Sequence, residues 1–190
     1  LRCVSRWGTI GAECNAEAMQ YFALLPPVGY TASPVKFVRV MSDWLNDQYW
    51  PGAITIVLGN DLGGLIPTDL AAVRANYENP QKYGIGRILD CINMVFLDVP
   101  INATVNIFAS AGFTAAQVQA QVEASLADFQ SFISIGEVVY PEKIGARMED
   151  GNKLAIRDVA LTSPSIPVQP AFNERVRLVI GTIIYNLVTG

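Results

Sequence analysis

Apolar residues along the first half of the chain change from helical spacing to continuous runs and back. Helical spacing predicts a helix over about 15–24 and a second one over about 68–79, with Thr68 as its N-cap. Between them, apolar runs at 35–41 and 53–58 predict two strands buried on both faces. The expected order of this half is helix, strand, strand, helix.

The second half contains the clearest pattern in the chain. Residues 90–109 predict two short strands joined tightly at Val99-Pro100, and the second of them alternates apolar and polar residues. Thr114 and Gln117 then form a capping box at the start of an amphipathic helix that runs to about Ile133. The pattern continues with a short helix and two strands, expected at 141–148, 154–161 and 176–184.

These elements predict an α+β fold with mainly antiparallel sheets and with helices packed on one side. We expect two consecutive units, an N-terminal one over residues 1–90 and a C-terminal one of order β-β-α-α-β-β over residues 91–190. The sequence contains no identical repeat, only units of similar size.

Four large side chains fall in the segment between the first two predicted strands. They are Trp44, Leu45, Tyr49 and Trp50, and we expect them on a connecting loop. Such a loop either folds back over the edge of the sheet or is presented to another chain, because aromatic residues dominate the energetics of interfaces. These four residues are the candidate partner interface.

Composition points to a chain that buries apolar surface against other chains. Of its 190 residues, 51% are hydrophobic and only 16% are charged, against about a quarter charged in typical soluble domains. The segment that comes closest to a membrane span, 178–188, is too short to cross a membrane. The formal net charge of −4 and the scattered basic residues disfavour binding to nucleic acid.

The sequence has no pattern that predicts catalysis or metal binding. It contains no histidine, which removes the commonest general base, and its three cysteines (Cys3, Cys14 and Cys91) have neither disulfide nor zinc spacing. The glycines at 59–64 and 84–86 lack the spacing of phosphate-binding loops. Asp98 and the pair Glu149-Asp150 are the only motive for a carboxylate-based hydrolase. We therefore expect no catalytic, cofactor or metal residues.

Two groups of polar residues fall on predicted strands. Arg39, Arg157 and Arg177 either face solvent, which we prefer, or pair with carboxylates on a sheet face. The polar positions Asn102, Thr104 and Asn106 form one face of their strand, and we expect that face to be covered by the chain or by a partner as often as by water.

The order of segments resembles the baseplate J family of contractile-tailed bacteriophages. The resemblance covers about residues 15–184 and rests on the whole series rather than on a single motif. The segments are AMQYFALLPP, SPVKFVRVMS, PGAITIVLGND, TDLAAVRANYENP, INMVFLDVPINATVNIFAS, AAQVQAQVEASLADFQSFISIGEVVYPEKIGARM and IRDVALTSPSIPVQPAFNERVRLVIGTI.

This resemblance implies a structural wedge protein of the tail baseplate, located in the virion and, during assembly, in the host cytoplasm. Its implied partners are other wedge proteins, copies of itself, and the hub, spike and sheath-connecting proteins. The family has no catalytic residues to transfer. Family members are longer at the N-terminus, and the segment 29–50 is shorter here, so the resemblance does not define which wedge contacts remain.

Two alternatives stay open at the level of sequence. Related proteins occur in R-type bacteriocins and other contractile injection systems, so the particle need not be a phage. In a different functional class, Trp44, Leu45, Tyr49 and Trp50 would bind a host receptor or a saccharide.

Overall fold

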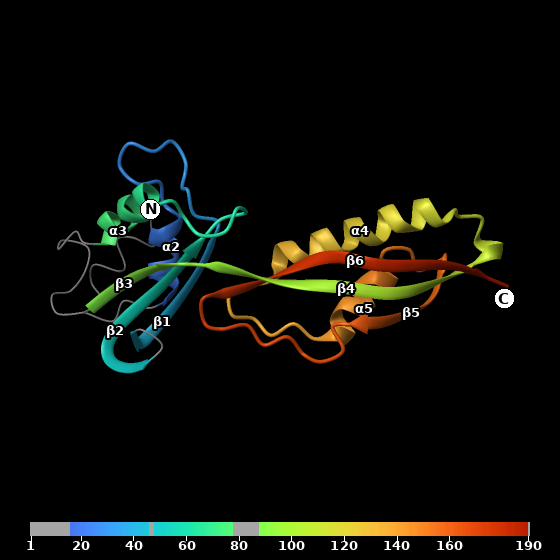
Figure 1. The fold of residues 1–190 in the computed structure, drawn as a ribbon. Coiled ribbons are helices and arrows are strands. Elements are labelled where there is room, and N and C mark those ends of the chain that lie inside the picture. Colours follow the sequence, from blue (N-terminus) through green and yellow to red (C-terminus); the bar gives the residue numbers. More distant parts are fainter. Residues whose placement is uncertain (1–15, 46–47, 78–87, 190) are drawn as a thin grey trace. The chain divides into compact units, whose positions relative to one another are not determined.

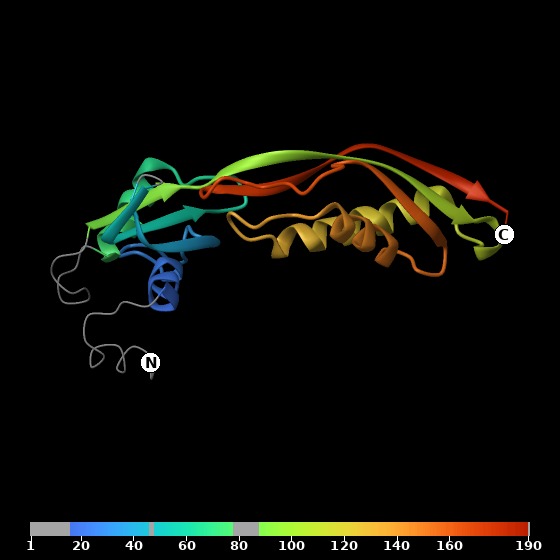
Figure 2. The same cartoon turned by 90° about the horizontal axis from the view of Figure 1, so that it is seen from below.

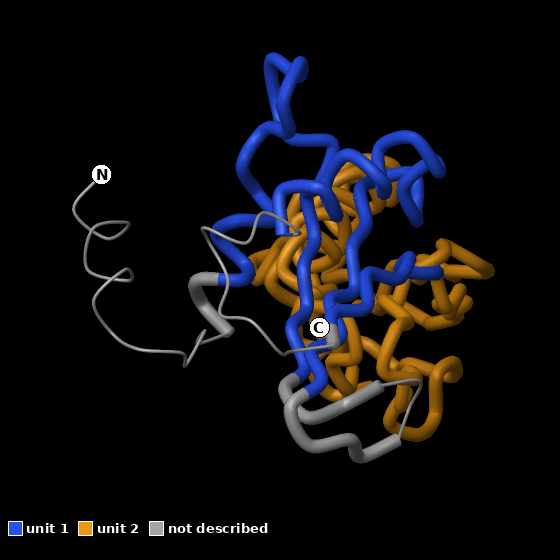
Figure 3. The backbone as a smooth tube through the Cα atoms, turned by 90° about the vertical axis from the view of Figure 1, so that its left-hand side faces the viewer, with its two compact units in different colours: residues 1–95 blue, residues 96–190 orange. Residues whose placement is uncertain are grey.

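The computed structural model describes residues 16–45, 48–77 and 88–189, and the chain divides into two compact units, Leu1–Val95 and Phe96–Gly190 (Figure 3). In the described residues each unit has one three-stranded sheet and two α-helices, which confirms the predicted α+β class. The elements, in order, are α2 (Ala16–Leu24), β1 (Phe37–Leu45), β2 (Gln48–Gly59), α3 (Pro67–Tyr77), β3 (Ile88–Asn93), β4 (Val95–Phe108), η1 (Ala109–Ala111), α4 (Ala115–Phe132), α5 (Pro141–Asp150), β5 (Ile156–Ser163) and β6 (Glu174–Val188).

The sheet of the first unit has the strand order β1-β2-β3. β1 and β2 pair in antiparallel fashion, and β3 joins β2 in parallel register. Helices α2 and α3 pack against the side of β2 that carries Ile56. The hydroxyl of Tyr77 donates a hydrogen bond of 2.6 Å to the carbonyl oxygen of Met19, so the two helices are joined inside the core.

Position in the sheet decides which predicted strand is buried. From Ala53 to Leu58, in the central strand β2, every side chain is at most 2% exposed, as predicted. The same prediction for 35–41 is wrong from Phe37 onward, where the side chains are only half-buried. β1 lies at an edge of its sheet, so among the described strands it has a neighbour on one side only.

The start of α3 also differs from the prediction. The helix begins at Pro67, so Thr68 lies inside its first turn and is not the N-cap. Proline suits the first helical position, because its missing N–H has no partner within the helix in any case. The predicted end of this helix near Asn79 lies outside the described residues.

The sheet of the second unit has the strand order β5-β4-β6, and α4 and α5 lie along one of its faces (Figure 2). β4 pairs with β5 in antiparallel fashion. β4 and β6 run in the same direction, since their side-chain contacts join residues 79 or 80 positions apart along both strands (Figure 1). Alternate residues of β4 face the helices and are at most 6% exposed: Val99, Ile101, Ala103, Val105 and Ile107. They pack against Val118, Val122 and Leu126 of α4.

The prediction that residues 90–109 form two strands of one sheet is wrong. Ile88–Asn93 is β3 of the first sheet, and Val95–Phe108 is one continuous strand of the second. Pro100 does not break this strand, because the ladder between β4 and β5 begins only at Asn102. A proline is tolerated in a strand where its missing N–H is not needed for a ladder. The C-terminal order is therefore β-α-α-β-β within the second unit.

Helix α4 has the predicted start. The hydroxyl oxygen of Thr114 accepts a hydrogen bond from the backbone N–H of Gln117, and the Gln117 side chain accepts one from the backbone N–H of Thr114. This capping box is confirmed, and it satisfies two N–H groups that the first turn of a helix leaves without a partner.

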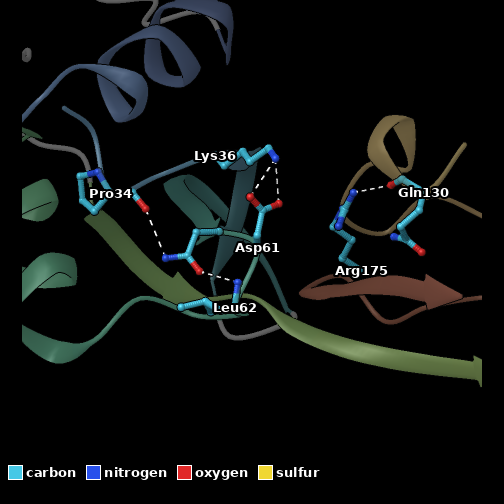
Figure 4. Close-up of polar contacts among 7 residues, drawn as sticks. Pro34, Lys36, Asp61, Leu62, Gln130 and Arg175 are labelled. Atoms are coloured by element: carbon cyan, nitrogen blue, oxygen red, sulfur yellow. Dashed lines mark hydrogen bonds and ion pairs between the residues drawn. The ribbon is translucent and has the colours of Figure 1, made fainter. Parts of the chain in front are cut away.

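The C-terminal end of α4 is held by a buried arginine of β6. Arg175 is 3% exposed, and its guanidinium donates hydrogen bonds of 2.6 Å to the carbonyl oxygen of Gln130 (Figure 4) and 2.7 Å to that of Ile133. The last carbonyl groups of a helix have no partner within it, and a cation there is also favoured by the helix dipole. Arg175 thus satisfies the end of α4 and ties it to β6.

Replacing Arg175 with methionine keeps most of the side-chain volume but removes these two charged hydrogen bonds. We expect the free energy of unfolding to fall by about 2–4 kcal/mol, because two carbonyl groups lose their buried donor. Urea unfolding followed by circular dichroism measures the change. The control is Arg157→Met at an exposed position of β5, which should alter stability by less than about 0.5 kcal/mol. Equal effects of the two substitutions would contradict this role of Arg175.

Candidate interaction surfaces

Two of the three carboxylates considered for catalysis, Asp98 and Asp150, are engaged in ion pairs. Both Asp98 oxygens accept hydrogen bonds from Arg177, at 2.6 and 2.7 Å, and Asp150 lies 2.8 Å from the Lys153 ammonium. These hydrogen bonds lower the pKa values of both carboxyl groups. A general acid needs the opposite shift, so this geometry gives no support to a hydrolase. Within the described ranges no three His, Cys, Asp or Glu residues converge as metal ligands.

The pair between Arg177 and Asp98 links β6 to β4 on the face of the sheet opposite the helices. The Arg177 guanidinium also lies over the ring of Phe96, 4.6 Å from its centroid, as a cation–π contact. Arg177 forms the carboxylate pair, which is the alternative that we did not prefer, while its side chain remains about half exposed. Arg157 lies 3.6 Å from the neighbouring Asp158 and is likewise about half exposed.

Asparagine side chains extend this link across all three strands. Asn102 Oδ1 accepts a hydrogen bond of 2.7 Å from the backbone N–H of Thr182 in β6, while Asn106 donates one of 2.6 Å to Asp158 in β5. We call the side carrying the even-numbered β4 residues, from Phe96 to Asn106, the outer sheet face. Helices α4 and α5 lie on the other side (Figure 2), so the outer sheet face is a candidate interaction surface.

The predicted aromatic loop is instead part of two strands. Trp44 and Leu45 end β1, Tyr49 and Trp50 belong to the beginning of β2, and the register places Trp44 opposite Tyr49. The expectation of a connecting loop at these residues is therefore wrong. Paired backbones extend further than the apolar runs that marked the strands, because a ladder needs backbone partners and not apolar side chains. The side chains of these four residues lie outside the described part of the structure.

The glycines at 59–64 serve a tight turn. Asn60 and Gly63 exchange backbone hydrogen bonds, and the carboxylate of Asp61 pairs with Lys36 at 2.8 Å (Figure 4). A Cβ atom on Gly59 would lie 2.7 Å from the end of the Met94 side chain and 2.9 Å from the carbonyl oxygen of Gly63. Close packing thus explains glycine here without a phosphate. The second glycine-rich place, 84–86, lies outside the described residues.

The strand β6 has exposed apolar side chains for which the sequence predicted no interaction role. Its exposed apolar side chains are Val179, Ile180, Ile184 and Leu187, between 41% and 61% exposed. The signal in the sequence is the uncharged run 178–188, which overlaps the strand predicted at 176–184. No helix among the described residues is long and apolar enough to cross a membrane.

Comparison with known proteins gives no further assignment, since neither the protein-family models nor the curated proteins include a match to this chain.

Substituting alanine for Gly59 should destabilise the protein by about 1–3 kcal/mol, because the new methyl group overlaps Met94 and the carbonyl oxygen of Gly63. The matched control is Gly145→Ala within α5, where no atom lies within 4 Å of the added carbon. That change should stabilise the protein by about 0.5–1 kcal/mol, because alanine favours the helix. Thermal unfolding of both variants measures the difference, and stabilisation by both would refute the close packing at Gly59.

The hydroxyl of Tyr185 in β6 is buried without a hydrogen-bond partner in the described residues, and burial raises its pKa to about 12. An unfolded tyrosine ionises near pH 10. Between pH 10 and 12 the unfolded state thus loses a proton that the folded state keeps, and stability falls as the pH rises. Tyr185→Phe should reduce this fall and raise stability at pH 7 by up to about 1 kcal/mol.

Urea unfolding at pH 7 and at several values from 9.5 to 12 tests this expectation. Tyr140→Phe, at a tyrosine that is 45% exposed, is the control and should follow the wild-type curve. A Tyr185→Phe curve parallel to that of the wild type at every pH would contradict it.

Proposed function

We propose that this chain is a structural subunit of a contractile-tail baseplate, a wedge component that assembles around the central hub and spike. The observation that carries the proposal is the ordered series of segments over residues 15–184 that resembles the baseplate J family. In this role the chain performs no catalysis, and its partners are other wedge proteins, copies of itself, and the sheath-connecting and fibre-side proteins.

The distribution of surfaces supports an assembly role. The outer sheet face combines asparagine amides, one ion pair and the Phe96 ring, which is the mixture of polar and aromatic groups typical of protein interfaces. The low charged fraction of 16% favours surfaces that neighbouring chains cover. Asp98 and Asp150, two of the three carboxylates considered for catalysis, are occupied by ion pairs, which favours a structural role over the hydrolase.

Immunogold labelling of contractile particles, purified from cells that make this protein, tests the proposal. With antibodies raised against the purified chain, we expect label at the baseplate end of the tail. Particles from cells lacking the gene for this chain are the control and should be unlabelled. Intact tails in those cells, or a chain absent from particles of the wild type, would overturn the proposal. Inhibition of host attachment by the free chain would favour the receptor-binding alternative instead.

The same particles test the candidate interface of Trp44, Leu45, Tyr49 and Trp50. Chains with Trp44→Ala and Trp50→Ala should unfold like the wild type but fail to enter particles, if these side chains contact a neighbour. Phe132→Ala is the control, since Phe132 is an exposed aromatic residue at the end of α4, 68% exposed. Lowered stability without an assembly defect would instead place the tryptophans within the fold.

A further inference from the structure

β6 is an edge strand, and the backbone groups along its open edge have only some of their hydrogen bonds. In the strand order β5-β4-β6 it has β4 on one side, and no described strand pairs with its other side. At its beginning, the side chain of Gln130 from α4 replaces a neighbouring strand. The Gln130 amide donates a hydrogen bond of 2.8 Å to the Val176 carbonyl and accepts one of 2.6 Å from the Leu178 N–H. Beyond this point lies what we call the free edge of β6, residues 179–188.

The free edge lacks the devices that protect other edges. Sheet edges avoid pairing with foreign strands through charged side chains, proline or short length. β5, at the opposite edge, has eight residues, carries Arg157 and Asp158, and is followed by Pro164. The edge strands β1 and β3 of the first sheet also carry charged residues. β6 is longer, with 15 residues, and has neither charge nor proline from Leu178 to its end.

All charged residues of β6 lie in its first four positions, and each is engaged. Glu174 accepts a hydrogen bond from the backbone N–H of Ala171, Arg175 binds the end of α4, and Arg177 pairs with Asp98. The free edge itself is rich in β-branched residues and exposes Val179, Ile180 and Ile184 at 41%, 44% and 53%. Such a neutral segment of high strand propensity is suited to pairing with another strand.

We propose that the free edge of β6 pairs with the free edge of β6 in a second copy of the chain, in antiparallel orientation. The two sheets then form one sheet of six strands with a two-fold axis near Ile183. Charge selects this orientation. An antiparallel pair centred on Ile183 places Arg177 opposite the neutral Thr189, whereas a parallel pair places Arg177 beside its own copy, and like charges in that position are destabilising.

The dimensions fit a stable ladder. Ten residues of antiparallel strand extend about 34 Å, and each copy offers the other the backbone groups of this edge that do not face β4. The same contact covers the exposed aliphatic side chains of both copies. This proposal depends on the edge of β6 and not on the tail-baseplate function, so each can fail without the other.

The oligomeric state of the purified chain tests the proposal. Sedimentation equilibrium from about 1 to 500 µM should give a dimer for the wild type and a monomer for Ile184→Lys. In the paired state the introduced ammonium group would lie opposite Thr182 and diagonally across from the same group of the second copy. The matched control is Ile166→Lys, at an exposed residue of the proline-rich loop, 72% exposed, which should remain a dimer. Circular dichroism and thermal unfolding verify that both variants are folded.

Hydrogen exchange locates the contact independently of any variant. In the wild type the amides of 179–188 should exchange more slowly at high than at low protein concentration. A wild type that is monomeric at every concentration would overturn the proposal. A dimer that persists in Ile184→Lys, or one in which another segment alone gains protection, would overturn it as well.

Discussion

The contact between Arg175 and the end of α4 is the interaction on which the second unit depends. A helix of 18 residues ends with carbonyl groups that need donors, and in a packed interior no water supplies them. One buried guanidinium supplies two of these donors from the neighbouring strand β6. Gln130 of the same helix completes the connection by binding the backbone of β6. The C-terminal end of α4 is thereby fixed to the beginning of the edge strand β6.

The two faces of this sheet differ because α4 and α5 lie along only one of them. The side that faces α4 and α5 holds the apolar core, with alternate residues of β4 almost fully buried. The outer sheet face carries polar side chains that bind one another across β4, β5 and β6. These hydrogen bonds between strands hold the polar side chains in place on a face that α4 and α5 do not cover. An ordered and partly polar face of this kind can receive a neighbouring chain at a smaller entropic cost than a mobile one.

The sequence predicted local structure best where one principle acted alone. The capping box at Thr114 and the stripe of Val118, Val122 and Leu126 follow from helical spacing and are present as predicted. The burial of alternate β4 residues from Ile101 follows in the same way from strand spacing. Predictions were wrong where the local structure depends on a neighbouring strand that is distant along the chain. Pro100 suggested a joint between two strands, but only the start of the β5 ladder at Asn102 determines whether its missing N–H matters.

By itself, therefore, the sequence determined the α+β class, most of the helices and strands, and the absence of histidine chemistry, because these depend on spacing and composition. Tertiary structure decided which strands pair, and so that Ile88–Asn93 belongs to the first sheet and Val95–Phe108 to the second. It also decided the partner of Arg175, 42 residues away from Ile133 along the chain. Such pairings depend on which backbone groups remain unsatisfied once the chain is packed, and a linear pattern does not contain that information.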